Sequence, residues 1–189
     1  MMTTRSRPRA IAVAMTLGAV LLTSACNDPK RAPSTSPPST STTTPSPTTT
    51  SPSPAERDSK AAGSAVVALW SVIDRVGADP KSKIEDLNTV ARGAVSSQWT
   101  KNLFDRRSRG ERFIGHTSVA IESSTSTGKS GEYRVGACLD VSKLNVVDAA
   151  GKSIVPSGRE PQIRYVYGVT QDKGTSKWYV TSEQASGKC

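Results

Sequence analysis

An unbroken run of proline, serine and threonine sets the limits on what this chain can fold into. Each of the 22 residues from Pro33 to Pro54 is one of these three types. The run has no apolar side chain that burial could use to offset the entropy lost on ordering, so we expect a disordered or polyproline-II-like stalk. Folding is therefore confined to Ala55–Cys189, which is long enough for one compact domain with a core and too short for two.

The residues before the stalk have the pattern of an exported lipoprotein. Residues 1–9 contain three arginines and no acid, and residues 10–22 form an uncharged, mostly apolar run. That run is too short to span a hydrocarbon core of about 30 Å, which indicates a signal peptide. Residues 22–26, Leu-Thr-Ser-Ala-Cys, resemble the bacterial lipobox, in which the cysteine is diacylated and becomes the new N-terminus. Ordinary cleavage after residues 23–25, which would release a soluble protein, remains the alternative.

This pattern predicts three parts: a lipoprotein signal peptide (1–25), the lipidated Cys26 with its stalk (26–55) and a globular domain (56–189). Two acyl chains give stable anchoring where one gives marginal binding. We therefore expect the protein on the extracytoplasmic face of a bacterial cell membrane, attached through its lipid. The stalk is either O-glycosylated or a bare spacer.

Charge and cysteine content narrow the partners and the compartment. Loss of the three signal-peptide arginines lowers the net charge from +9 to +6, with the densest basic group at Arg106–Arg112. An exported chain without a base-stacking motif is a poor nucleic-acid binder. With Cys26 lipidated, Cys138 and Cys189 are the remaining pair in an oxidising compartment, and we predict that they form a disulfide. A buried free Cys138 with an unpaired Cys189 is the alternative.

Hydrophobic spacing predicts three helices in the first half of the domain. Apolar residues recur every three or four positions over Glu56–Val76, which we expect to end at Gly77. Ser82–Glu85 has the form of a capping box, and its apolar pattern continues to Gly93. A third helix is predicted from Ala94 to about Arg107.

The second half of the domain alternates with period two instead. Strands are predicted at 117–123, 133–141, 163–169 and 178–182, where 178, 180 and 182 share one face. Short strands, with Val146 and Val147 on one side and Ile154 and Val155 on the other, should flank a turn at 148–152. Helices followed by antiparallel strands predict an α+β domain with the helices packed on one sheet face.

The order of these elements resembles the NTF2-like (SnoaL-like) fold, in the version attached to actinobacterial lipoproteins and membrane-anchored proteins. The resemblance rests on Arg109–Gly115 leading into the first strand, Ala137–Val141 in the second, then Tyr165–Val169 and Trp178–Val180. It implies a cone in which three N-terminal helices cover a curved antiparallel sheet. Family members use this cone as an enzyme cavity, a ligand pocket or a filled core that supports protein contacts, so the fold alone does not choose among them.

Few residues are candidates for chemistry. His116 is the single histidine, and it could shuttle protons but is more simply a polar residue at the mouth of the first strand. Asp140 would be a general base only if its sheet face were the concave one, and a solvated or salt-bridged carboxylate is the simpler interpretation. The sequence offers no zinc ligand set, catalytic triad or phosphate-binding loop, and nothing in it calls for a cofactor. Residues that could either line a pocket or fill the cone are Trp70, Trp99, Tyr165, Tyr167 and Trp178.

We therefore expect a non-enzymatic, membrane-anchored module that binds an envelope protein or another envelope component, with its oligomeric state open. An exposed patch around Arg106–Phe113 is the expected binding surface. One alternative is an isomerase- or hydrolase-type enzyme with its site in the cone, using Asp140 and His116. Another is a component of an export, conjugation or phage-exclusion system.

Overall fold

The computed structural model describes residues 51–189. The predicted signal peptide, Cys26 and nearly all of the predicted stalk lie outside these residues. The helical elements are α1 (Pro54–Ala78), the short 3-10 helix η1 (Ile84–Thr89) and α2 (Gly93–Ser108). The strands are β1 (Arg112–Ile114), β2 (Ser118–Ser126), β3 (Glu132–Asp140), β4 (Asn145–Val147), β5 (Gln162–Gln171) and β6 (Trp178–Lys188).

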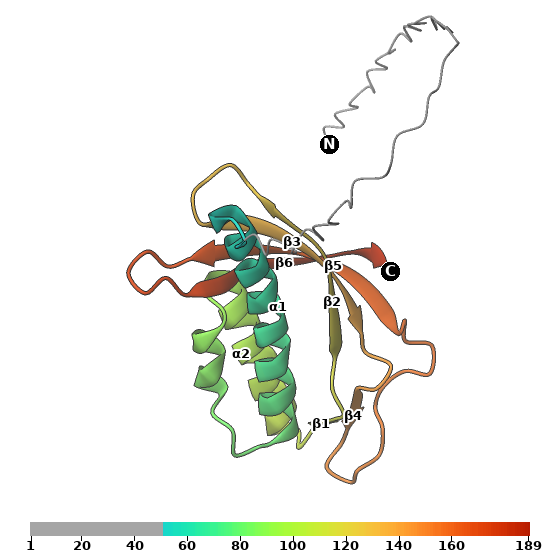
Figure 1. Cartoon of the computed structure of the whole chain (residues 1–189). Helices are drawn as coiled ribbons and strands as arrows, with labels where there is room; N and C mark the ends of the chain where they lie inside the picture. The colour runs from blue at the N-terminus through green and yellow to red at the C-terminus, as the bar shows by residue number, and fades with distance from the viewer. Residues whose placement is uncertain (1–50) are drawn as a thin grey trace, which may run out of the picture. The chain divides into compact units, whose positions relative to one another are not determined.

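The predicted α+β class is confirmed. An antiparallel sheet runs in the order β2-β3-β5-β6, and β1 and β4 form a separate two-stranded ribbon. The helices α1 and α2 lie side by side on one side of the curved four-stranded sheet (Figure 1). We call the sheet face toward these helices the inner face and the opposite one the outer face. This is the arrangement that the NTF2-like resemblance implies.

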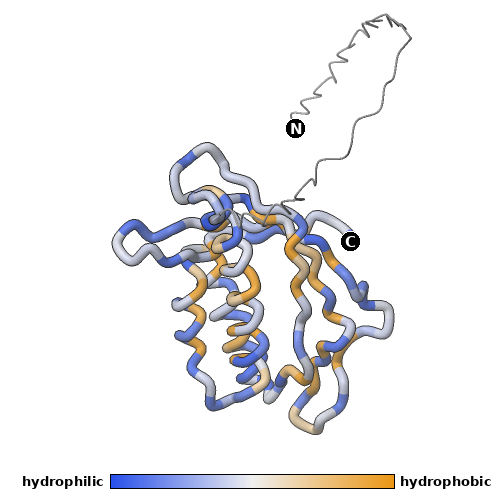
Figure 2. The backbone as a smooth tube through the Cα atoms, in the orientation of Figure 1, coloured by the Kyte–Doolittle hydropathy of each residue, from blue (hydrophilic) through white to orange (hydrophobic). Residues whose placement is uncertain are grey.

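The core lies between the helices and the inner face. Apolar stretches of α1 and of the strands face one another across this space (Figure 2). Period-two burial is clearest in β3, where Tyr133, Val135, Ala137 and Leu139 are buried and the residues between them are more exposed. The largest fully buried side chains are Tyr167, Leu69, Ile73, Leu87, Leu139, Val66, Val76, Val95, Val135, Val169 and Val180.

Helix α1 is longer than predicted at both ends. It begins at Pro54, the last residue of the Pro/Ser/Thr run, where Ser53 caps the helix and Glu56 completes a capping box. The prediction that Gly77 ends this helix is wrong, because the helix continues to Ala78. Gly77 has a packing role instead. A Cβ at this position would lie 2.3 Å from the Phe113 ring, so glycine is what allows β1 to pack against α1.

The second predicted helix is a single 3-10 element, and the predicted capping box at Ser82 is wrong. The cap residue of η1 is Lys83, which makes no side-chain capping bond. The Ser82 hydroxyl donates a hydrogen bond to the Asp79 carboxylate instead of capping η1. The same carboxylate also accepts a hydrogen bond from the Lys81 amide. The domain therefore has two α-helices and a 3-10 turn where three helices were expected.

Bulges explain why the alternation of strand residues between the two sheet faces departs from the predicted pattern. Val180 pairs with Val169 whereas Ser182 pairs with Gly168, so Thr181 is an extra residue that reverses the alternation. The expectation that 178, 180 and 182 share a face therefore fails beyond Val180. In β2, the corresponding irregularity lies at Glu122.

The ribbon of β1 and β4 was predicted only in part. Strand β4 was expected before the 148–152 turn, but the chain after that turn forms a single bridge, between Ser153 and Val147, in place of a second strand. The partner of β4 is β1, whose three residues are too few to show a period. Sequence alternation therefore could not reveal it.

Within the described residues, α1 is the one helix long and apolar enough to cross a membrane by length and composition. Its apolar face packs against the sheet as part of the core.

Candidate functional site

The aromatic residues that the sequence marks as possible pocket lining mostly fill the cone. The Trp70 and Trp99 rings pack edge to face with centroids 5.4 Å apart. The Trp70 indole N–H donates to the Tyr167 hydroxyl at 2.9 Å, and Tyr167 is fully buried. The Tyr165 ring stacks on Tyr167 at 5.9 Å. These four aromatic residues therefore form one packed cluster between α1, α2 and β5.

The fifth predicted residue, Trp178, belongs to a different contact. Its ring packs edge to face on Tyr133 with centroids 5.5 Å apart. The Tyr133 hydroxyl in turn donates to the Ala55 carbonyl at 3.4 Å, near the start of α1. Trp178 therefore helps to hold the N-terminal end of α1 in place and is not part of the Trp70 cluster.

A carboxylate that the sequence analysis missed adjoins this cluster. Glu183 faces inward because of the bulge at Thr181, and its Oε1 accepts a hydrogen bond from the Trp99 indole at 2.9 Å. Its Oε2 is buried and, among the described residues, has no hydrogen-bond partner. Burial raises the pKa of Glu183, and the Trp99 bond opposes this only in part. A hollow of about 350 Å³ includes Glu183 and Tyr167 in its lining, but it lies mostly against outer-face residues such as Arg134, Gly168 and Ser182.

Asp140 does not lie in the cone. Its neighbour Leu139 is buried on the inner face, so Asp140 is on the outer face with Cys138, as alternation predicts. Hydrogen bonds from Ser142, and then from Gln162, lower the pKa of Asp140 to about 2. A carboxylate with so low a pKa is a weak base, so the arrangement disfavours the general-base role.

His116 is exposed just before β2, and the group of interest beside it is Asp74 on α1. The Asp74 carboxylate is buried and accepts hydrogen bonds from the Thr117 amide at 2.6 Å and from the Thr117 hydroxyl at 3.1 Å. Burial raises the pKa of Asp74, whereas the Thr117 bonds and the nearby His116 lower it. Asp74 thus ties α1 to the start of β2. The hydrogen bonds of Asp140 come from Ser142 and Gln162, and none among the described residues joins it to His116.

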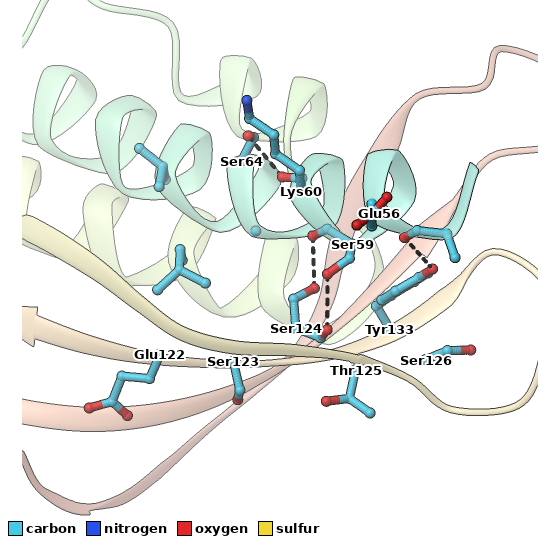
Figure 3. A pocket seen from close by; sticks show the side chains of 14 residues that line it. Glu56, Ser59, Lys60, Ser64, Glu122, Ser123, Ser124, Thr125, Ser126 and Tyr133 are labelled. Carbon is cyan, nitrogen blue, oxygen red and sulfur yellow. Dashed lines mark hydrogen bonds between the residues drawn. The ribbon is translucent and has the colours of Figure 1, made fainter. Parts of the chain in front are cut away.

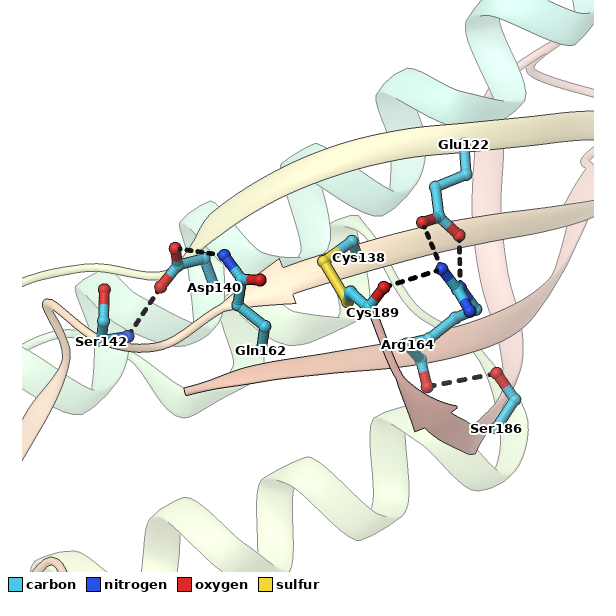
Figure 4. The surroundings of a disulfide bond; sticks show 8 residues. All are labelled: Glu122, Cys138, Asp140, Ser142, Gln162, Arg164, Ser186 and Cys189. Atoms are coloured by element: carbon cyan, nitrogen blue, oxygen red, sulfur yellow. Dashed lines mark hydrogen bonds and ion pairs between the residues drawn. A yellow bond between two sulfur atoms is a disulfide. The ribbon is translucent and has the colours of Figure 1, made fainter. Parts of the chain in front are cut away.

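Cys138 and Cys189 are joined, with 5.9 Å between their Cα atoms. The bridge lies on the outer face, beside Arg164 of the strand between β3 and β6 (Figure 4). The Arg164 guanidinium donates to both oxygens of Glu122, at 2.7 and 3.0 Å, and to the Cys189 carbonyl at 3.4 Å. The outer face therefore carries the Cys138–Cys189 disulfide bond and the bidentate Arg164–Glu122 ion pair.

The arginines near the end of α2 do not form the free basic patch that we expected as a binding surface. Arg107 donates to the backbone carbonyls of Val76, Asp79 and Ser82. Arg106 and Arg109 both pair with Glu111, and Phe113 is buried. Arg107 therefore holds the ends of α1 and α2 together, whereas Arg106 and Arg109 are held by Glu111 in the segment between α2 and β1.

A groove of about 750 Å³ lies instead between α1 and β2 (Figure 3). Its walls are one face of the first half of α1 and most of β2. A Cβ added at Gly63 would lie 3.4 Å from the Ile121 side chain across the groove. Two aliphatic side chains in this groove are exposed, Val67 by 44% and Ile121 by 38%. The sequence gives no sign of this groove, because it depends on how far apart a helix and a strand are held.

Polar ties close the seam between α1 and β2 at both ends. At one end Ser59 and Ser124 exchange two hydrogen bonds, each hydroxyl donating to the other residue's carbonyl, at 3.0 and 2.8 Å. At the other end Asp74 holds Thr117. Between these ties the seam is apolar and accessible. We call this stretch, made of Gly63, Val67 and Ile121, the apolar window.

No group of three or more histidine, cysteine, aspartate or glutamate side chains within residues 51–189 is arranged to hold a metal ion.

Comparison with known proteins gives a fold and no family. The sequence matches no family model and no curated protein. The structure is similar to the intermembrane space region of the chloroplast protein ARC6, with 18% identity, a TM-score of 0.56, and coverage of 69% of this chain and 97% of that one. It is less similar to a cystatin-like protein of unknown function from Nostoc punctiforme (14% identity, TM-score 0.37, 70% of this chain and 91% of that one). A putative calcium/calmodulin-dependent protein kinase II association domain from Xanthomonas campestris gives 11% identity, a TM-score of 0.36, and 66% and 84% coverage. At these identities the likeness to the ARC6 region shows the fold alone.

Proposed function

We propose that this protein is a lipid-anchored extracytoplasmic binding module, an NTF2-like domain of the actinobacterial lipoprotein type. In this proposal Cys26 attaches the chain to the membrane, the Pro/Ser/Thr run acts as a stalk, and the domain binds an envelope protein or another envelope component. The observation that carries the binding role is the groove between α1 and β2, because it exposes Val67 and Ile121 in a domain whose inner face is otherwise well packed.

The anchor is tested by cell fractionation. The variant Cys26→Ala should move the protein from the membrane pellet to the culture fluid, because it removes the residue that would carry both acyl chains. The matched control is Cys189→Ala, which also removes one cysteine but leaves the predicted acylation site intact and should stay in the pellet. A Cys26→Ala protein that remains in the pellet would overturn lipid anchoring.

The binding role is tested by chemical crosslinking in intact cells, followed by mass spectrometry. Expression of the native chain should give the same crosslinked envelope component in repeated experiments, and Cys26→Ala should lose it, because the released domain no longer stays at the membrane. Absence of any specific crosslink under several growth conditions would count against a binding module.

A small-molecule site in the cone is the second candidate, favoured by one observation. Glu183 has a raised pKa and a buried oxygen that, among the described residues, has no hydrogen-bond partner, and it lies beside the Trp70 cluster. A carboxyl group with a raised pKa keeps its proton to a higher pH than an ordinary glutamic acid, and such a group can take part in proton transfer. Native mass spectrometry tests this: a small molecule that stays bound to the native chain and is lost from Glu183→Gln would favour a ligand or enzyme site. Identical spectra would remove it.

A further inference from the structure

Strand β2 lies at the edge of the four-stranded sheet. It pairs with β3 on one side, and among residues 51–189 no strand pairs with its other side. One backbone carbonyl there, that of Ser124, accepts a hydrogen bond from the Ser59 side chain. Natural edge strands are usually protected by lysine, proline or a bulge. β2 contains no lysine or proline, and its bulge lies at Glu122, so Ser118–Ile121 has none of these protections.

The unpaired edge and the apolar window lie next to each other. Ile121 belongs to both, and Val67 stands beside it on α1 as another lining residue of the groove. A lipid chain would cover the two aliphatic side chains but leave the backbone of β2 unpaired. A bound helix would also leave the β2 backbone unpaired, because the backbone groups of a helix are already hydrogen-bonded to one another. An extended polypeptide satisfies both needs, because its backbone can pair with β2 while alternate side chains reach the window.

We propose, on the basis of the proposed binding role, that an extended segment of another protein binds along β2 as a fifth strand and places an aliphatic side chain against Val67 and Ile121. The ties at Thr117 and Ser124 set the length of this contact. They leave residues 118–123 accessible, which corresponds to about 20 Å of extended chain.

The charges near the groove indicate that the bound segment is uncharged where it faces the window. The Glu122 side chain points away from α1, and the Lys60 ammonium group points away from β2 (Figure 3). Glu122 is also engaged by both nitrogens of the Arg164 fork. Glu56 lies at the end of the groove, where its carboxylate accepts a hydrogen bond from the Ser53 amide. A charged side chain placed in the window would therefore lose water without gaining an ionic partner.

Site-specific photocrosslinking of the full chain in intact cells tests this proposal. A photoreactive amino acid replaces Val67 or Ile121 in the window, and Phe104 or Ile154 as control positions of similar or greater exposure outside the groove. Positions 67 and 121 should give the same crosslinked protein, at least tenfold more than the controls. The crosslink should map to an uncharged, extended stretch of about six residues in that protein.

Substitutions in the window then test its chemistry. Crosslinking through position 67 should fall at least tenfold with Ile121→Lys and persist with Ile121→Val. Crosslinking through position 121 should also fall at least tenfold with Val67→Lys. Because Val67 lies on α1, this loss could not be explained by misfolding of β2. Ile154→Lys is the matched control and should leave crosslinking through positions 67 and 121 unchanged. The thermal midpoint of each variant shows whether it is folded.

Each other outcome has a definite meaning. Crosslinks from positions 104 or 154 alone would overturn the β2 proposal and leave a binding module in place. Crosslinks from the window to a lipid, to a helical segment or to a second copy of this chain would also overturn it. No crosslink from any of the four positions would count against both this proposal and the binding role.

Discussion

The two faces of the four-stranded sheet are stabilised in different ways. The inner face is covered by α1 and α2 and filled by residues such as Leu69 and Tyr167, which are fully buried. The outer face has no helix over it within the described residues. It is crossed instead by the Cys138–Cys189 bridge and by the Arg164–Glu122 ion pair.

This difference shows how a small domain can keep a strongly curved sheet with helices on only one side. Burial holds the inner face, and its loss should be felt locally as a cavity. On the outer face the disulfide restricts the unfolded chain, and the ion pair between exposed groups adds little because water screens it. The two faces should therefore respond differently to substitution, to reductant and to pH.

The largest effect should come from the outer face. The double variant Cys138→Ser with Cys189→Ser should lower the free energy of unfolding by about 4 kcal/mol, because the bridge closes a loop with a sequence separation of 51. Urea denaturation measures the change. Reductant should destabilise the native chain by the same amount and leave the double variant unaffected. A loss under about 1 kcal/mol would show that the outer face does not depend on its covalent link.

On the inner face, Leu69→Ala should lower the free energy of unfolding by about 3 kcal/mol. Leu69 is fully buried under the sheet, so its truncation leaves a cavity as well as removing apolar contact. The loss of unfolding free energy caused by reductant should add to the loss caused by Leu69→Ala, because the disulfide and the cavity lie on different faces. Urea titrations with and without reductant test the additivity, and a loss that disappears on reduction would contradict it.

A buried carboxyl group gives the inner face a pH dependence of its own. Burial raises the pKa of Glu183 in the folded chain above its ordinary value of 4.5. In the pH interval between the two values the folded state holds a proton that the unfolded state has lost, so stability falls as pH rises through it.

The variant Glu183→Gln removes this titration and keeps an acceptor for the Trp99 indole. Its thermal midpoint should equal that of the native chain near pH 4 and exceed it by a few degrees at pH 7. The difference between the two chains isolates Glu183, because Asp74 and the outer-face carboxylates titrate in both. A variant whose midpoint follows the native chain in parallel from pH 4 to pH 7 would contradict a raised pKa.

The inner face also shows how much of the fold the sequence could predict. Its period-two pattern in residues 133–141 and its helical pattern in residues 56–76 correctly predicted β3 and most of α1, since both reflect burial on one side. Prediction failed at Gly77 and at Glu183. The need for glycine at position 77 is explained by the ring of Phe113, which is distant in sequence and leaves no room for a side chain. Glu183 turns inward because of one extra residue at Thr181, which alternation alone cannot detect.

The candidate site was less predictable than the fold. Cysteine counting found the bridge, because pairing depends on number and compartment as well as on geometry. The arginines of residues 106–112 suggested a basic surface, but their partners include backbone carbonyls, which no sequence pattern marks. The groove depends on the spacing between α1 and β2, a property of neither element alone.

The smallest effect on stability should come from the seam between α1 and β2, which belongs to neither sheet face. Val67 lies two residues from Leu69 on α1, yet 44% of it is exposed in the groove. Val67→Ala should therefore change the free energy of unfolding by about 0.5 kcal/mol or less, where Leu69→Ala costs several times more. Photocrosslinking through position 121 should nevertheless fall in Val67→Ala, because half of the aliphatic window is gone. Urea denaturation and crosslinking of the same variant separate the two roles. A large loss of stability with unchanged crosslinking would mean that Val67 serves the core, and that the groove is a gap in packing instead of a binding surface.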